Sequence, residues 1–309
     1  MIKLLKVQLK TRLSSMWFIA AAAICLLFGI MFGTGHSRPV TEDFGYQLED
    51  MPYIIAVIVC GVLAAVFIGS EFQEGTVRSK LTMGYSKTVF YISQLLFMLI
   101  VSLILFLLVT VPYFLMAYKN FFSLFSTEYL IKAFGLILLS MAGCSVLFTL
   151  VCMSIRLRTV SIIICAALAF GIDIASSQLS RDILKPEYTE AVYVDMEESG
   201  NISYQTSTIA KSTEYIEKPL RDFMKASYYA IPISGVKQAG IIISTEIMAF
   251  SDKDKDKVTD YYEENKYLWD KDFALETHFE LWRYPAWLIP EMIVLTAAGI
   301  IIFRKRNVY

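Results

Sequence analysis

The hydrophobic positions of this chain gather into six long runs. An α-helix needs about 20 apolar residues to cross the hydrocarbon core of a membrane. Because backbone N–H and C=O groups find no other partners in lipid, each run is predicted to be a membrane-spanning helix. Pro112, near the end of the third run, predicts a kink or a helix end there. The runs are Trp17–Gly33, Pro52–Gly69, Val89–Phe114, Tyr129–Met153, Thr159–Ala175 and Pro285–Phe303.

The first fifteen residues predict a separate helix that lies in the membrane interface. Lys3, Lys6 and Lys10 share one helical face, whereas Arg12 falls on another face among apolar residues. Such a helix can turn its lysines toward anionic lipid head groups. A cleavable signal peptide is the alternative, because a basic start precedes an apolar run. We disfavour it, since no convincing small-residue cleavage site follows the first run and five further runs come after it.

The only large polar segment, Ser176–Tyr284, separates the fifth run from the sixth. It contains 20 acidic and 13 basic residues. A loop this long is unusual without structure of its own, so we predict a small α+β extracellular domain. Within it, Val192–Thr208 alternates as a strand does, and Ser251–Trp269 is typical of a charged helix. Tyr228–Phe250 is apolar but interrupted by polar residues, which leaves open a segment on the membrane surface or a re-entrant one.

The predicted architecture is therefore an all-α polytopic membrane protein with one polar insertion. Residues 1–175 form the interfacial helix and five spans, 176–284 the extracellular domain, and 285–309 the sixth span and a tail. Hydrophobic residues make up 56% of the chain, more than the roughly half of an average soluble domain. With the N-terminus in the cytoplasm, twelve lysines and arginines flank the inner ends of the spans and three flank the short outer connections. The positive-inside rule thus places both termini in the cytoplasm.

Several classes of chemistry find no support in the sequence. The two histidines, His36 and His278, belong to no Cys/His cluster, so no metal site is expected. The nearest approach to a phosphate-binding loop, Gly84–Thr88, lacks the required glycine and lysine spacing. The five cysteines all lie in apolar runs, which favours buried thiols over disulfides. We therefore expect neither an enzyme nor a bound cofactor in this chain, and no nucleic-acid partner.

Polar residues within the spans are costly in lipid and usually face a bundle interior. Four such residues could line a substrate path. Lys132, Asp173 and Glu291 are near the predicted outer ends of their spans, where their side chains could also reach water. The four candidates are Gln94, Lys132, Asp173 and Glu291.

The connection between the second and third runs, residues 70–88, has an unusual composition. Two acids one turn apart precede a Gly-Thr pair, and spaced bases follow. We interpret it as a short cytosolic helix, too charged to span, at the inner membrane surface. The residues proposed to contact a partner are Glu71, Glu74, Gly75, Thr76, Arg78, Lys80, Leu81, Ser86 and Lys87.

This pattern, E-x-x-E-G-T-x-R-x-x-L-x-x-G-x-S-K, resembles the first cytosolic loop of type-2 ABC exporter permeases. Gly84 stands where that family often has proline, and Lys87 where it often has arginine. The layout of an interfacial helix, six spans and a large loop before the last span is also similar. The resemblance covers the whole chain in layout but only about 20 residues in motif.

The resemblance implies a permease subunit driven by a separate ATPase, which binds the ATP and Mg. The loop would be the coupling helix, with Glu71 and Glu74 facing bases of the ATPase. It also implies a second permease copy or homologue, contact with membrane lipids, and export of a drug, an antimicrobial peptide or a lipid-like substrate from a bacterial plasma membrane. The alternative is a sensor or immunity protein that does not transport and binds a ligand through its extracellular domain.

Overall fold

The structure, a computed structural model, describes residues 2–35, 50–118, 127–155, 157–183, 188–196, 202–211, 216–239 and 283–305. Within these ranges six helices are long and apolar enough to cross a membrane, and they match the six predicted runs. They begin and end a few residues beyond the apolar runs. They are α2 (Met16–Gly35), α3 (Met51–Gln73), α5 (Lys87–Ala117), α6 (Thr127–Ser154), α7 (Arg158–Ile183) and α12 (Arg283–Lys305).

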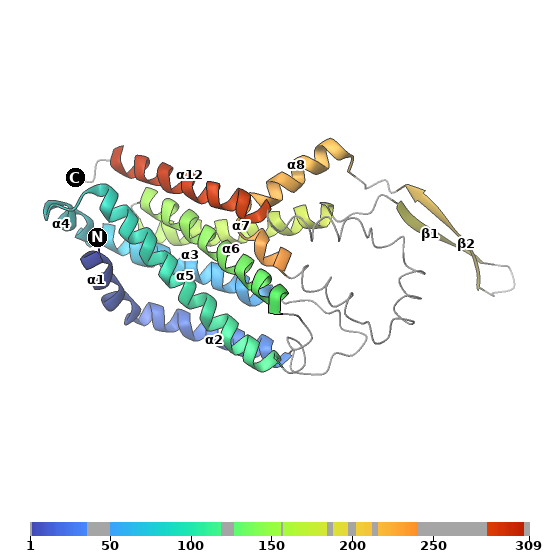
Figure 1. Ribbon diagram of the computed structural model, residues 1–309, viewed down its shortest axis with the longest axis horizontal. Coiled ribbons are helices and arrows are strands. Elements are labelled where there is room, and N and C mark those ends of the chain that lie inside the picture. Colours follow the sequence, from blue (N-terminus) through green and yellow to red (C-terminus); the bar gives the residue numbers. More distant parts are fainter. Residues whose placement is uncertain are drawn as a thin grey trace.

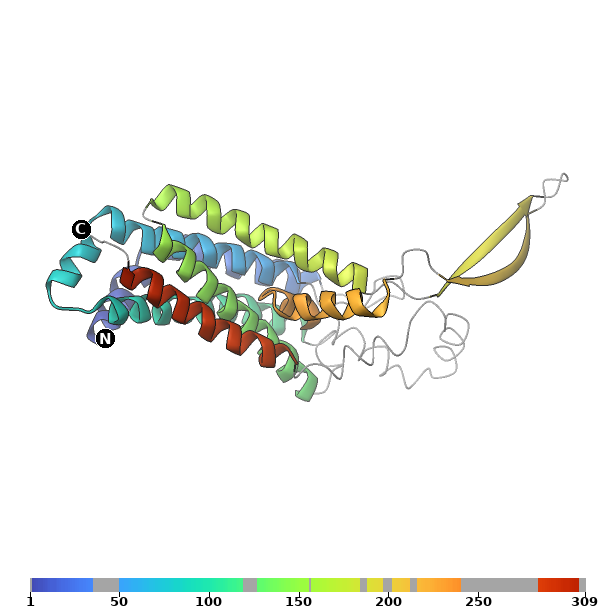
Figure 2. The same ribbon diagram turned by 90° about the horizontal axis from the view of Figure 1, so that it is seen from above.

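The six helices lie side by side in one bundle (Figures 1 and 2). The N-terminus, the C-terminus and a short helix, α4 (Thr76–Thr82), lie together at one end, which we call the α4 end. A two-stranded hairpin projects from the other end, which we call the hairpin end. Helices α3 and α6 are the most buried, and α12 is the most exposed along its length. Pro112 does not end α5, which continues for another turn beyond it.

The N-terminal segment forms a separate helix, α1 (Ile2–Leu13), as the sequence predicts. Ser15 forms the joint to α2: its hydroxyl donates to the Arg12 carbonyl at 2.6 Å and accepts from the Phe18 N–H at 3.3 Å. Lys3, Lys6 and Lys10 are exposed, whereas Leu4 and Gln8 are buried against the bundle. The helix therefore has one basic face and one face that packs on the spans.

Two glycines bring α2 unusually close to α5. A Cβ on Gly29 would lie 2.6 Å from the Val109 carbonyl oxygen, and one on Gly33 would lie 3.1 Å from Tyr113 Cα. Gly29 and Gly33 are four residues apart, which is the small-residue spacing that lets two helices in a membrane approach closely. The backbone of α2 therefore packs directly on the backbone of α5 and on its Pro112 and Met116 side chains.

The predicted extracellular α+β domain is not supported by the described residues. Helix α7 continues to Ile183, two turns past the predicted domain boundary. The strand predicted over Val192–Thr208 is instead a hairpin, in which β1 (Tyr188–Met196) pairs antiparallel with β2 (Ile202–Lys211). This two-stranded ribbon extends away from the helices in both views (Figures 1 and 2). The helix predicted at 251–269 lies outside the described residues.

The chain returns from the hairpin through α8 (Lys218–Tyr229) to the bundle. Arg221 on α8 donates to the Ile183 carbonyl at the end of α7 at 3.0 Å. Residues 232–239 then enter the hairpin end of the bundle, where Ile233, Ser234 and Val236 are fully buried. The described part of Tyr228–Phe250, the segment whose position the sequence left open, is therefore inserted among the helices. Its apolar residues pack on them.

The glycine contact between α2 and α5 predicts a position-specific effect on stability. Gly29→Ala should destabilise the protein by about 1–3 kcal/mol, because the added methyl group meets backbone. Gly35→Ala, on the same helix, is the matched control, since a Cβ there meets nothing within 4 Å. Thermal unfolding of the two purified variants in one detergent measures the difference. Equal melting temperatures would contradict the close packing.

Candidate functional site

The loop predicted over residues 70–88 forms the last turn of α3, the helix α4 and the start of α5. Gly75 separates the two helices with a φ of 69°, and Gly84 follows α4 with a φ of 92°. Both angles lie in the left-handed region that favours glycine. Ser86 then begins α5 as its N-cap, accepting from the Val89 N–H at 3.2 Å. The predicted short helix is thus present, and Gly75 separates it from α3.

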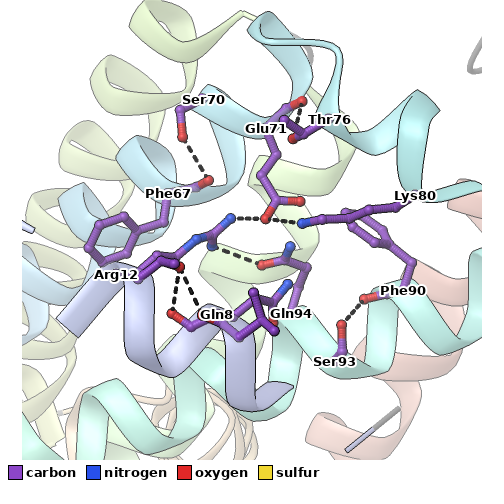
Figure 3. A network of polar contacts seen from close by, with 12 residues as sticks. Gln8, Arg12, Phe67, Ser70, Glu71, Thr76, Lys80, Phe90, Ser93 and Gln94 are labelled. Carbon is purple, nitrogen blue, oxygen red and sulfur yellow. Dashed lines mark hydrogen bonds and ion pairs between the residues drawn. The ribbon is translucent and has the colours of Figure 1, made fainter. Parts of the chain in front are cut away.

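Glu71, at the end of α3, lies at the centre of a polar network (Figure 3). One oxygen of its carboxylate accepts hydrogen bonds from the Arg12 guanidinium and from Lys80 Nζ, the latter at 2.7 Å. Arg12 also donates to the Gln94 side-chain oxygen at 3.2 Å. The network thereby joins α1, α3, α4 and α5 through four side chains.

The network is largely excluded from water. The side chains of Glu71 and Arg12 are only 7% and 11% exposed. The Arg12 guanidinium carbon lies 5.5 Å from the centre of the Phe67 ring and 5.2 Å from that of Phe97. Burial lowers the pKa of Arg12, while the carboxylates of Glu71 and Glu74 oppose this shift. An arginine nevertheless stays charged at physiological pH, so Glu71 binds two cations in a poorly hydrated place.

Glu71 therefore does not face a partner, contrary to the role that the family resemblance suggested for it. Its side chain points into the protein, and Thr76 Oγ1 donates to its backbone carbonyl at 3.1 Å. Glu74, one turn further on, is exposed. The physical reason is position: residue 71 is still on the face of α3 that packs on the bundle, whereas residue 74 follows the end of that helix.

The remaining residues of the loop divide between a buried and an exposed face. Val77 is buried, and Leu81 is half-buried against the hydrophobic core. Lys80 is half-buried, with Nζ 5.5 Å from the centre of the Phe90 ring. The exposed residues of the loop are Gln73, Glu74, Gly75, Arg78, Ser79, Thr82, Met83, Gly84 and Ser86. They form the exposed face, which is the part of the loop that a partner could reach.

The loop is also tied to the last span, α12. Lys87 Nζ donates to the Arg304 carbonyl, at the end of α12, at 3.1 Å. Phe303 packs between Phe72 and Phe90, with ring centres 6.3 and 5.8 Å away. A positive side chain at the C-terminal end of a helix stabilises its last carbonyls. The two ends of the loop therefore contact the same turn of α12.

The four predicted path residues have different surroundings. Gln94 belongs to the Glu71 network, and Lys132 pairs with Glu128 on the surface at 2.6 Å. Asp173 pairs with Lys237 at the hairpin end. Glu291 is half-buried, and its Oε2 has no hydrogen-bond partner among the described residues. The described residues also contain no group of His, Cys, Asp or Glu side chains that could hold a metal ion.

Arg12 is a site residue that sequence reasoning missed. Gln8 lies one turn earlier on α1 and is 2% exposed, but its side-chain oxygen and nitrogen have no hydrogen-bond partner among the described residues. The available signal was the position of Arg12 away from the lysine face of this helix. Its partner could not be identified, because Glu71 is 59 residues further along the chain.

A family model described as ABC-2 family transporter protein matches residues 8–176, more than half of the chain. The match runs from Gln8 in α1 to Ser176 in α7, and it includes all four helices of the Glu71 network. A search of individual curated proteins found no match.

The two acids of the loop should respond differently to neutralisation. Glu71→Gln should cost about 3 kcal/mol in stability, because it removes the counter-charge of the poorly hydrated Arg12 and of the half-buried Lys80. Glu74→Gln is the matched control one turn away, and we expect a change within about 0.5 kcal/mol, as for exposed residues. Thermal unfolding of the purified chain compares the two. A Glu71→Gln protein as stable as the Glu74→Gln protein would refute the network.

Proposed function

We propose that this chain, which belongs to the ABC-2 family of transporter proteins, is the permease subunit of an ATP-driven exporter and receives force through α4. Membrane subunits of this family generally pair with an ABC ATPase. The chain is accordingly a multi-pass membrane protein of an ABC transporter. Our proposal adds the direction of transport and the residues through which the ATPase acts.

The observation that best supports this proposal is the two-sided construction of the α4 loop. Its exposed face presents an acid, Glu74, a base, Arg78, and an apolar side chain, Met83, which is 75% exposed. Such a mixed surface suits a protein partner, with the charges setting the docking orientation. Its inner face is fixed to the bundle by Glu71, Lys80 and Val77. A displacement of the exposed face would therefore reach the spans.

The contacts of α4 suggest which spans would respond. The Glu71–Arg12 pair connects the loop to α1, and the Ser15 joint continues this connection to α2. Lys87 and Phe303 connect the loop to α12. Separating a buried ion pair is costly because it leaves uncompensated charges. We infer that α4 transmits rigid-body motion to α1 and α2 on one side and to α12 on the other.

The remaining features of the proposal follow from charge and family. We place the α4 end and both termini in the cytoplasm of a bacterial cell, because the lysines and arginines that flank the spans are concentrated on that side. ATP and Mg would bind to the ATPase, and a second permease copy or a homologue would complete the pathway. The substrate would be a drug, an antimicrobial peptide or a lipid-like molecule. A sensor without transport has no evident need for an anchored α4, so we favour the exporter.

Reversal of the exposed charges tests the docking surface. The double variant Glu74→Lys, Arg78→Glu should reach the membrane normally but co-purify with at least about tenfold less ATPase, because its charges oppose those of the partner. Asp222→Lys, an exposed charge reversal on α8, is the control at the opposite end. Quantitative co-purification with the endogenous ATPase provides the measurement. Undiminished recovery of ATPase by the double variant would exclude this surface as the contact.

A further inference from the structure

Helix α1 carries three lysines on the face that points away from the bundle, which we call the lysine face. Lys3, Lys6 and Lys10 are exposed, and none of their side chains forms an ion pair or a hydrogen bond with any described residue. Positions three and four residues apart are neighbours on a helix surface, so the three charges follow one another along about 10 Å of α1. Within the described part of the chain this face has no counter-charge, and it therefore fits an anionic partner.

Apolar side chains lie next to the lysine face. Val7, between the lysines, is 61% exposed, and Ile2 is also exposed. Met16 and Trp17, at the start of α2, are exposed as well. Lysines beside exposed apolar residues are typical of a helix that binds a membrane surface, whose head groups attract the charges and whose acyl boundary takes up the apolar side chains. This combination favours a lipid surface over the acidic surface of a soluble protein.

The start of α2 marks the level of the lysine face relative to the membrane. The Arg158 guanidinium carbon, at the first residue of α7, lies 5.4 Å from the centre of the Trp17 ring. Tryptophan and arginine at the ends of spans are characteristic of the boundary between hydrocarbon and water. Helix α1 ends at Leu13, three residues before α2 begins, and lies at the α4 end of the bundle (Figure 1). The lysine face is therefore at the level of the lipid head groups.

The opposite face of α1 is attached to the Glu71 network. Arg12 follows Lys10 by two residues, which turns it about 200° around the helix. Its guanidinium donates to Glu71, whose same oxygen accepts from Lys80 on α4. Displacing α1 from the bundle would separate the Arg12–Glu71 pair, which is costly because both charges are poorly hydrated. Helix α1 thus connects the lysine face on its outer side with α4 on its inner side.

We propose that the lysine face binds anionic phospholipid head groups, and that this contact regulates α4 by holding Arg12 on Glu71. Each lysine near an anionic surface adds to the attraction, so three lysines on one face respond strongly to the charge of the lipid. The regulation rests on the proposed function, because α4 acts there as the contact with the ATPase. The lipid contact itself does not, and it is tested without an ATPase.

The lipid contact is tested on the full chain in neutral detergent micelles, with an environment-sensitive fluorophore on Val7→Cys. The five native cysteines are buried, so the label is directed to α1. The labelled chain should bind added phosphatidylglycerol at least about tenfold more tightly than phosphatidylcholine. Glutamine at Lys3, Lys6 and Lys10 together should reduce this preference to within about twofold, whereas arginine at the same three positions should retain it.

A comparison of single charges locates the contact. Lys6→Gln should weaken binding of phosphatidylglycerol about fivefold, because one lysine leaves the face. Arg78→Gln is the matched control, since Arg78 is an exposed base on α4 at the same end of the bundle. It should change the affinity by less than about twofold. Unlabelled native cysteines in each variant exclude unfolding as the cause.

Three results would overturn the lipid contact. The first is equal binding of the two lipids by the parent chain. The second is an undiminished preference in the triple glutamine variant, which would assign the lipid to other bases. The third is a fluorescence response to purified ATPase but none to phosphatidylglycerol, which would assign the lysine face to the ATPase.

The regulation is tested on the co-purified complex in lipid nanodiscs. Replacing part of the phosphatidylcholine by phosphatidylglycerol should raise ATP hydrolysis at least about threefold, because the bound state of α1 keeps α4 attached to the bundle. The triple glutamine variant should hydrolyse ATP at the same rate in both lipids, and the triple arginine variant should respond as the parent does.

ATP hydrolysis that ignores phosphatidylglycerol in the parent complex would overturn the regulation while leaving the exporter assignment intact. A response that persists in the triple glutamine variant would overturn it as well. Failure of any ATPase to co-purify with the unmodified chain would instead overturn the proposed function. Binding of phosphatidylglycerol to the chain alone would then still decide whether the lipid contact exists.

Discussion

The ion pair between Glu71 and Arg12 is the contact on which the α4 end depends. Either charge alone would be costly to bury, so α1 can pack on α3 and α5 only if the two meet. Lys80 brings a second cation to the same carboxylate and so fixes α4 relative to α3. Gln94 completes the arrangement from α5. A single carboxylate thus binds α1 and α4 to the helix that bears it, and Arg12 extends the connection to α5.

Much of the fold could be predicted from the sequence because its determinants are local. Membrane spans depend on the summed hydrophobicity of about 20 consecutive residues, and all six appear in the structure. The break at Gly75 could also be predicted, since a Gly-Thr pair between charged residues favours a helix end and the next helix start. The exposed position of Glu74 agrees with its place beyond the last turn of α3.

The rest could not be predicted, because it depends on partners that are distant in sequence. Glu71 and Glu74 look equivalent in the loop motif, and only the location of Arg12 distinguishes them. As an unpaired charge, Lys237 counted against insertion of its segment into the bundle. Its partner, Asp173, is 64 residues earlier and could not be identified from the sequence. Because the sequence does not reveal the Lys237–Asp173 pair, the long polar segment before the last span suggested a separate domain. The structure instead returns part of that insertion to the bundle.

The glycine contact between α2 and α5 has a mechanical consequence. Because backbone touches backbone at Gly29 and Gly33, the two helices cannot slide past each other without steric conflict. Helix α5 begins at the end of the α4 loop, and α2 leads back through α1 and Arg12 to Glu71, just before that loop. The contacts among α1, α2, α5 and the α4 loop therefore form a closed ring. A ring of contacts leaves these elements few independent motions, so we expect them to tilt together as one rigid body instead of bending at one joint.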